Sequence, residues 1–314
     1  METDSRIYVA GHTGMVGSAL VRGLKRQGYT NLVARTHAEL DLTDQAATER
    51  FFREEKPEYV FLAAARVGGI CANSTYPADF IMENMMIECN VIRSACARGV
   101  KKLMLLGSSC IYPKLCPQPI KEEYLLTGEL EPTNEAYALA KISGIKMCQS
   151  YNMQYGTKYI SVMPASLYGL NDRFDFNNSH VIPAMMMKFY RAKLEERPFV
   201  ELWGTGTPLR EFLYTDDMAD ACISLMNHYE GNDFINIGSG EEISIRELSE
   251  IIRKTVGYTG EIIFDPSKPD GTPRRVLDNS KILQTGWRPQ VPIEEGIRRE
   301  YEYFLEKIMP DLFS

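Results

Sequence analysis

Residues 7–17 read I-Y-V-A-G-H-T-G-M-V-G, and this stretch decides the fold class. An apolar run typical of a strand, Ile7–Ala10, enters a glycine turn that opens the pattern of a helix. Its three glycines are spaced G-x-x-G-x-x-G, which lets the backbone turn tightly, approach a pyrophosphate and pack the helix on the strand. The helix N-terminus then offers N–H groups to phosphates. We therefore expect a dinucleotide-binding unit rather than a turn of structural importance only.

Short apolar runs alternate with helical patterns through the first half of the chain. Such alternation predicts parallel strands joined by helices, that is, an α/β fold with a doubly wound parallel sheet of Rossmann type. The expected strands are Ile7–Ala10, Leu32–Arg35, Tyr59–Leu62, Leu103–Leu106 and Tyr159–Met163, and the expected helices lie near Met15–Gln27, Asp44–Lys56, Ala78–Ala97 and Asn134–Tyr155.

The composition changes after Pro164. Residues 165–211 are rich in Asn, Asp, Met and Pro and predict a single helix around Pro183–Glu196. A strand near 234–238 and a helix near Ser244–Val256 follow. We expect a smaller α/β substrate domain interleaved with the first. The expected division is 1–165 plus about 212–239 for the dinucleotide-binding domain, and about 166–211 plus 240–314 for the substrate domain.

Composition and charge exclude several classes of protein. The 314 residues are 44% hydrophobic and 25% charged, which is ordinary for a globular protein, and the net charge of −7 gives no reason to expect a nucleic-acid partner. No apolar stretch reaches the roughly 18 residues of a membrane span, and the N-terminal residues do not resemble a signal peptide. The seven cysteines are scattered without C-x-x-C spacing, so we expect neither a disulfide framework nor a metal site, and a cytoplasmic setting.

The segment Y-A-L-A-K at 137–141 carries the first candidate catalytic pair. In a helix, Tyr137 and Lys141 are one turn apart on the same face. An ammonium beside a phenol is expected to lower the phenol's pKa from about 10, which makes it a useful proton donor and acceptor. Ser108 stands at the end of the preceding strand. A chance pair on the helix surface is the alternative interpretation.

Together these motifs resemble the extended short-chain dehydrogenase/reductase family. W-G-T-G-T-P-L-R-E-F-L-Y-T-D-D at 203–217 is similar to that family's substrate-domain signature. Within the family, the chain most resembles the GDP-L-fucose synthases, and the likeness extends over nearly its whole length. The motifs that carry it are G-S-S-C-I-Y-P at 107–113, P-T-N-E-A-Y-A-L-A-K at 132–141, N-S-H-V-I-P-A at 178–184 and K-P-D-G-T-P-R at 268–274.

The resemblance implies NADPH-dependent conversion of GDP-4-keto-6-deoxy-D-mannose to GDP-L-fucose. A C4 ketone acidifies the protons at C3 and C5, so both epimerisations must precede hydride transfer to C4. Ser108 and Tyr137 would hold the C4 oxygen, with Lys141 beside them. Cys110 and His180 are by resemblance the additional acid/base pair, and thiols and imidazoles titrate on either side of neutral pH. A buried thiol and a loop histidine are the structural alternatives.

The cofactor is expected to be NADP(H). Arg35 ends the second strand where an acid would favour NAD, and an arginine there accommodates a 2′-phosphate. Better-known bacterial members have arginines at the positions of Thr13 and His37, which leaves Arg35 and His37 for this contact. The expected cofactor contacts are Gly11, His12, Thr13, Gly14, Met15, Val16, Gly17, Arg35, His37, Asp41, Leu106, Gly107, Lys141, Pro164, Leu167 and His180.

The resemblance also implies a set of substrate contacts and a quaternary structure. A diphosphate needs cations, and a tryptophan can stack on guanine or pack against the sugar. The expected contacts are Lys188, Trp203, Arg210 and Asp270. A homodimer that pairs through the helices including that of Tyr137 is expected.

The chain departs from the family pattern after the fifth strand. It reads P-A-S-L-Y-G-L-N-D-R-F where the family more often has P-T-N-L-Y-G-P-H-D-N-F. The sugar could therefore be a related GDP-4-keto-6-deoxy sugar such as a heptose, reduced with or without epimerisation. A 4,6-dehydratase would need an acid in the S-S-C-I-Y loop, and a 4-epimerase has no use for Cys110 and His180. A non-catalytic dinucleotide-sensing module would not need Tyr137 and Lys141.

Overall fold

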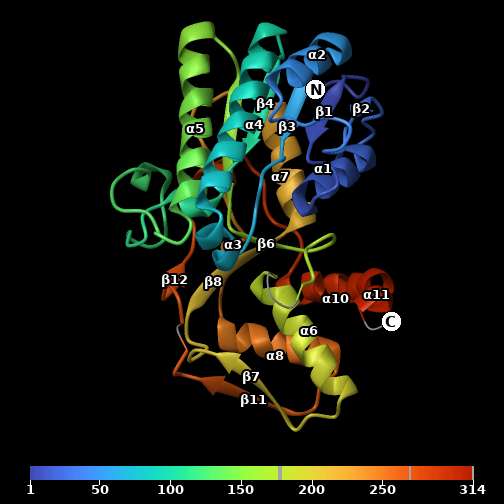
Figure 1. Cartoon of the computed structure of the whole chain (residues 1–314), viewed down its shortest axis with the longest axis vertical. Coiled ribbons are helices and arrows are strands. Elements are labelled where there is room, and N and C mark those ends of the chain that lie inside the picture. The colour runs from blue at the N-terminus through green and yellow to red at the C-terminus, as the bar shows by residue number, and fades with distance from the viewer. Residues whose placement is uncertain (176–178, 269, 313–314) are drawn as a thin grey trace.

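The computed structural model describes residues 1–175, 179–268 and 270–312, and a six-stranded parallel sheet forms its upper half (Figure 1). The strand order is β2-β1-β3-β4-β5-β9, so the chain changes direction across the sheet between β1 and β3. Ligands of such sheets bind at this switch point, outside the carboxyl ends of the strands. The strands are β1 (Ile7–Ala10), β2 (Leu32–Val33), β3 (Tyr59–Leu62), β4 (Lys102–Leu106), β5 (Tyr159–Pro164) and β9 (Ile235–Ile237).

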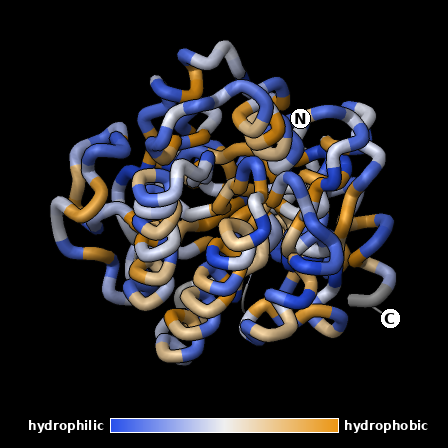
Figure 2. The backbone as a smooth tube through the Cα atoms, turned by 90° about the horizontal axis from the view of Figure 1, so that it is seen from above, coloured by the Kyte–Doolittle hydropathy of each residue, from blue (hydrophilic) through white to orange (hydrophobic). Residues whose placement is uncertain are grey.

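Helices cover both faces of this sheet. Because side chains alternate along a strand, Ile7 and Val9 of β1 pack with α1 and α7, whereas Tyr8 and Ala10 pack with α2, α4 and α5. Figure 2 shows the resulting concentration of apolar residues between the helices. The helices of this half are α1 (Met15–Arg26), α2 (Gln45–Glu55), α3 (Ile70–Thr75), α4 (Pro77–Ala97), α5 (Glu135–Tyr155), α7 (Thr215–His228) and α9 (Ser280–Gln284), with 3-10 turns η1 (Ser109–Ile111) and η2 (Glu122–Tyr124).

Two apolar clusters lie on the two faces of the large sheet, and the lower half is built around a third. Its strand β8 (Leu209–Tyr214) pairs with β6 (Ser166–Tyr168), β10 (Glu242–Ser244) and β12 (Arg274–Arg275). Strands β7 (Phe199–Trp203) and β11 (Glu261–Asp265) form a separate parallel pair. The helices are α6 (Val181–Leu194), α8 (Ile245–Val256), α10 (Ile293–Tyr303), a π-helical turn (Phe304–Ile308) and α11 (Met309–Leu312). Along the described residues, no helix is long and apolar enough to cross a membrane.

Local sequence signals explain several helix ends. The side chain of Asp44 caps α2 by accepting from Ala47 N at 3.0 Å. A capping box between Ser244 and Glu247 starts α8, and Gly257 ends it with a left-handed φ of 71°.

The expected fold class is confirmed, with differences in detail. The strands and helices of the first half agree to within about two residues at their ends, as is usual for sequence patterns. The helix expected around Pro183–Glu196 is confirmed as α6, but the strands β6, β7 and the start of β8 in residues 165–211 were not anticipated. The helix α7 was not anticipated either.

Candidate active site

The glycine turn after β1 brings the backbone to where a pyrophosphate could lie. Gly11 has φ +79°, and a Cβ there would be 2.7 Å from Ala64 N, so no larger residue fits without a shift. A Cβ at Gly17 would lie 2.0 Å from the carbonyl oxygen of Gly11. Gly14 begins α1 and no side chain caps the helix, which leaves its first N–H groups free for phosphate oxygens. This geometry fits a dinucleotide cofactor.

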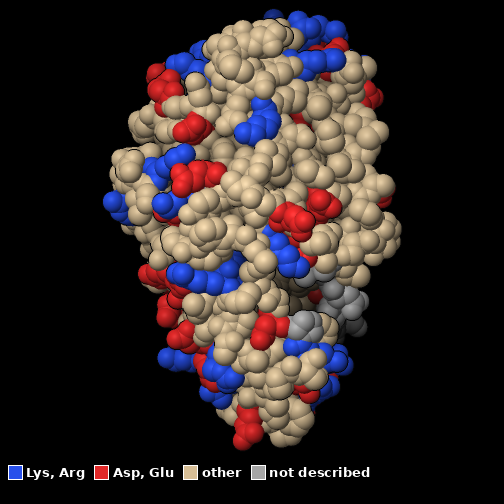
Figure 3. All heavy atoms as spheres, turned by 90° about the vertical axis from the view of Figure 1, so that its left-hand side faces the viewer, with Lys and Arg blue, Asp and Glu red and all other residues tan. Residues whose placement is uncertain are grey.

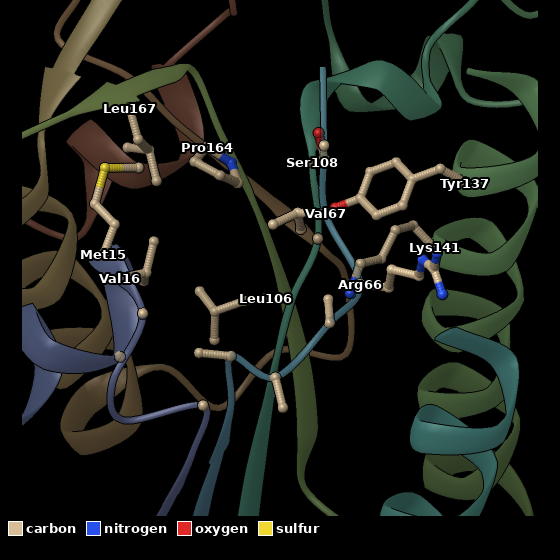
Figure 4. Close-up of a pocket in the computed structure, with 18 of the residues that line it drawn as sticks. Met15, Val16, Arg66, Val67, Leu106, Ser108, Tyr137, Lys141, Pro164 and Leu167 are labelled. Carbon is tan, nitrogen blue, oxygen red and sulfur yellow. The ribbon is translucent and has the colours of Figure 1, made fainter. Parts of the chain in front are cut away.

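A cavity of about 830 Å³ opens beside this turn at the carboxyl ends of the strands (Figure 4). Met15, Val16, Pro164 and Leu167 line one wall, and Ser108, Tyr137 and Lys141 lie across the space from them. The predicted site residues that line the cavity are Gly11, Thr13, Gly14, Met15, Val16, Gly17, Arg35, His37, Asp41, Leu106, Gly107, Ser108, Cys110, Tyr137, Lys141, Pro164, Leu167 and His180.

Three candidate catalytic side chains meet where β4 ends. Ser108 is the N-cap of η1, and its Oγ lies 2.7 Å from Cys110 Sγ. The same Oγ accepts a hydrogen bond from Cys110 N at 3.4 Å. Tyr137, from α5, is hydrogen-bonded to Ser108. A thiol, a hydroxyl and a phenol therefore converge on one side of the cavity.

The expected lowering of the Tyr137 pKa is wrong. Burial raises the pKa of Tyr137 well above 10, the charges of Cys110 and Glu88 add to this, and the hydrogen bond with Ser108 opposes it. Burial is the largest cause of this rise in pKa, and Glu88 on α4 adds to it: its Oε1 is 3.0 Å from Lys141 Nζ. A carboxylate so close to the ammonium partly offsets its charge as seen by the phenol.

His180, the N-cap residue of α6, lines the same cavity. Its Nδ1 lies 3.1 Å from Oδ1 of Asp172, a buried carboxylate, while 57% of the imidazole side chain is exposed. The hydrogen bond with Asp172 raises the pKa of His180 above 6.5, against the effect of burial. His180 is thus both oriented and favoured in its protonated form.

The far end of the cavity carries the residues expected near the adenosine. Arg35 forms an ion pair with Glu55, and its guanidinium lies 5.8 Å from the ring centre of Phe51. Asp41 accepts hydrogen bonds from the backbone and hydroxyl of Thr43, which lower the pKa of Asp41. The ion pair with Glu55 uses only part of the N–H donors of the Arg35 guanidinium, so Arg35 can still bind a phosphate.

Five of the predicted site residues do not line this cavity. His12 is part of the glycine turn, and its Nδ1 is buried and lacks a hydrogen bond. Lys188 is exposed on α6. Trp203, Arg210 and Asp270 gather instead at the ends of β7, β8 and the loop after β11, where Asp270 accepts from Thr205 N at 2.7 Å. Residues 178 and 269 of the quoted motifs are outside the described residues.

Sequence reasoning missed three polar residues that shape the site. Glu88 is a charged residue on the buried face of α4, between Phe80 and Val91, and a charge at such a position is the signal that could have revealed it. Asp172 lies eight residues before His180, but only the folded loop brings the two side chains together. Arg275 on β12 donates from Nη2 to the backbone oxygen of Ser109 at 2.6 Å, joining the lower half to the catalytic loop.

Comparisons with known proteins agree with this geometry. The profile of the "NAD dependent epimerase/dehydratase family" matches residues 7–238. The chain is 57% identical to GDP-L-fucose synthase 1 of Arabidopsis thaliana over 98% of its length and 95% of the relative's. It is 53% identical to GDP-L-fucose synthase of Escherichia coli K12, over 97% of this chain and 98% of that protein.

A solved structure extends the comparison to three dimensions. A GDP-mannoheptose C4 reductase from Campylobacter jejuni with NADP bound has a TM-score of 0.90 and 42% identity, covering 97% of this chain and 99% of that one. Sequence and fold thus point to the same relatives. The chain belongs to the NAD-dependent epimerase/dehydratase family and, within it, to the GDP-L-fucose synthases.

Proposed function

We propose that the protein converts GDP-4-keto-6-deoxy-D-mannose to GDP-L-fucose by epimerisation at C3 and C5 and reduction at C4. The observation that carries this proposal is the convergence of Ser108, Cys110 and Tyr137, with Oγ and Sγ 2.7 Å apart, in one cavity with His180. A simple reductase needs Ser108, Tyr137 and Lys141. An additional thiol and imidazole have a use only when protons move at carbon.

Epimerisation uses the C4 ketone as an electron sink. One member of the pair Cys110 and His180 removes the proton from C3 or C5, and the electron pair moves into an enolate whose oxygen is O4. Ser108 and Tyr137 donate hydrogen bonds to that oxygen, where the negative charge develops. The other member returns a proton to the opposite face of the carbon, which inverts it.

Reduction ends the sequence because it consumes the ketone. Bound NADPH supplies the hydride for C4. As the oxygen becomes an alkoxide, Tyr137 gives it the phenolic proton, and Lys141 stabilises the phenolate that remains. Burial keeps Tyr137 protonated at neutral pH, so the donor is ready before the hydride arrives.

The direct test is an incubation of the purified protein with GDP-4-keto-6-deoxy-D-mannose and NADPH. NADPH oxidation together with GDP-L-fucose, identified by proton NMR, is the expected result. A product reduced at C4 with C3 and C5 unchanged would contradict the epimerase half of the proposal.

A second candidate is C4 reduction of a related GDP-4-keto-6-deoxy sugar such as a heptose. The similarity to the Campylobacter reductase favours it, as does the altered stretch Ala165–Asn171, of which Ala165, Ser166 and Leu167 line the cavity. Faster turnover of the heptose than of the hexose, without exchange at C3 or C5, would select this candidate.

We propose NADP(H) as the cofactor, with Arg35 binding the 2′-phosphate. Replacing Arg35 by Ala should raise KM for NADPH by about 10- to 100-fold, the value of one or two charge-assisted hydrogen bonds, with no change for NADH. Steady-state kinetics with both cofactors measure this. Arg53→Ala, on the exposed side of α2, is the matched control. An equal increase in KM for NADPH and NADH would show that Arg35 does not bind the 2′-phosphate.

Asp172 should control the protonation of His180. In Asp172→Asn the charged acceptor is lost, so the pKa of His180 falls toward its ordinary value and the imidazolium is lost at lower pH. The alkaline limb of deuterium uptake at C3 and C5 should therefore move to lower pH, while the cofactor KM stays unchanged. The measurement is solvent exchange followed by mass spectrometry across pH. If the alkaline limb of deuterium uptake does not move in Asp172→Asn, Asp172 does not control the protonation of His180.

The nucleotide part of the substrate is assigned to the lower half of the molecule. Arg210 makes no ion pair among the described residues, and it pairs in register with Arg275 across β8 and β12. Two neighbouring guanidinium groups favour binding of a diphosphate. Trp203, 64% exposed, offers a face for guanine, and Lys188 is retained as an expected contact.

We propose a division into 1–165 plus about 212–239, and about 166–211 plus 240–314. The apolar clusters support it in part, because Phe212 and Tyr214 pack in the lower cluster. Leu277, Ile282 and Trp287, in contrast, pack with the upper half.

We propose a homodimer that pairs through α4 and α5. Large apolar side chains are exposed on these helices, among them Met82, Leu139, Met153 and Tyr155. Figure 3, which views the molecule from the α5 side, shows that uncharged side chains cover most of its upper half. Light scattering after gel filtration should give twice the mass of one chain, and the mass of a monomer would contradict it.

A further inference from the structure

The buried ion pair beside Tyr137 has a carboxylate that the proposed chemistry does not use. The Glu88 side chain on α4 and the Lys141 side chain on α5 are each only 2% exposed, and Nζ and Oε1 are 3.0 Å apart. Apart from Lys141, no side chain in the described ranges forms an ion pair with Glu88. A buried charged pair is costly to desolvate, so it adds little to stability compared with apolar residues. Its place next to the catalytic phenol therefore needs another reason.

The helix opposite Glu88 is shaped to admit its carboxylate. Tyr137, Lys141 and Gly144 follow one another on the same face of α5. A Cβ at Gly144 would lie 2.3 Å from Glu88 Oε2 and 2.8 Å from Leu105 Cδ2. A glycine inside a helix is less favourable than an alanine, because it loses more backbone freedom on folding. Here it gives the carboxylate room to reach Lys141.

We propose that Glu88 is a positioning residue that holds Lys141 beside Tyr137 and partly offsets its charge, so that Tyr137 serves as the proton donor to O4 and not as a standing phenolate base. This inference rests on the proposed function. It assigns the two kinds of proton transfer to different groups. Tyr137 donates at oxygen during reduction, and Cys110 with His180 exchanges protons at carbon.

The electrostatic surroundings of Glu88 support this assignment. Its titratable neighbours are Lys141, Tyr137 and Cys148 on α5 and Cys89 on α4, and the carboxylate raises the pKa of Tyr137, Cys148 and Cys89 in addition to the effect of burial. The strands behind the pair contribute Leu105 and Ser161, which carry no charge. Burial raises the pKa of Glu88 itself, and the ammonium of Lys141 opposes that rise. Lys141 is thus the one cation near the carboxylate among these neighbours.

Replacing Glu88 by Gln removes the charge and keeps the shape. The ammonium of Lys141, no longer offset by a carboxylate, would favour the phenolate of Tyr137. This shifts the alkaline limb of kcat for NADPH oxidation to lower pH, by about one unit or more for a charge this close. KM for NADPH should change far less than kcat measured above neutral pH.

Two further variants make the test decisive. Gly144→Ala keeps every charge but displaces the carboxylate, and we expect a smaller shift of the limb in the same direction. Glu122→Gln removes another buried carboxylate, remote from the cavity, and should lower the melting temperature without moving the limb. If the parent does not reduce GDP-4-keto-6-deoxy-D-mannose, the proposed function itself is refuted, independently of the role of Glu88. If the parent is active and neither Glu88→Gln nor Gly144→Ala moves the limb, Glu88 is only structural.

Discussion

Replacing Tyr137 by Phe should lower the rate of C4 reduction by about a hundred- to ten-thousand-fold, the usual contribution of a general acid. The phenol is the group that can protonate O4 from this side of the cavity, and without it the charge that develops on the oxygen is not neutralised. The fold should survive, because the ring packs edge-to-face on Phe80 with centroids 6.3 Å apart, and Phe keeps that contact. The loss of NADPH absorbance under saturating substrate measures the effect.

Tyr151→Phe is the matched control, since it removes a phenol from the same helix away from the cavity. Exchange at C3 and C5 should fall less in Tyr137→Phe than reduction does, because Ser108 still donates to the enolate oxygen. Reduction at the parental rate in Tyr137→Phe would refute the assignment of the proton donor.

Replacing Cys110 by Ser should separate the two halves of the reaction. A hydroxyl is a far weaker acid and base at neutral pH than a thiol, so exchange at C3 and C5 should fall by about a hundred- to ten-thousand-fold. Hydride transfer to C4 should persist, because Tyr137 and Lys141 are untouched. The expected product is a rhamnose-type sugar that has been reduced without inversion, seen by proton NMR.

Cys116→Ser provides the control for this experiment. Cys116 lies farther along the same loop and does not line the cavity, so its variant should resemble the parent. Undiminished exchange in Cys110→Ser would make Cys110 a structural thiol and leave His180 without its partner.

The first half of the fold was predictable because its signals are local. The turn from Ile7 to Gly17 contains the strand, the glycines and the helix start within eleven residues. The helix α5 likewise carries Tyr137 and Lys141 one turn apart, so their shared face follows from periodicity alone. Such patterns need no knowledge of distant contacts.

The lower half was not predictable to the same degree because its strands depend on remote partners. The strand β8 pairs with β6, β10 and β12, and β7 pairs with β11 from more distant sequence. The stretch Leu209–Tyr214 does not show the simple alternation of apolar and polar residues that marks a strand in the sequence. The electrostatics of the site escaped prediction for the same reason, since Glu88 reaches Lys141 from another helix and Asp172 reaches His180 across a loop.

The most direct measurement is one incubation in D₂O with GDP-4-keto-6-deoxy-D-mannose and NADPH, analysed by mass spectrometry and proton NMR. The site described here predicts GDP-L-fucose that carries deuterium at C3 and C5 and the protium of NADPH at C4. Oxidised cofactor together with a sugar that is reduced at C4 but unlabelled at C3 and C5 would contradict the assignment of Cys110 and His180 as the acid/base pair.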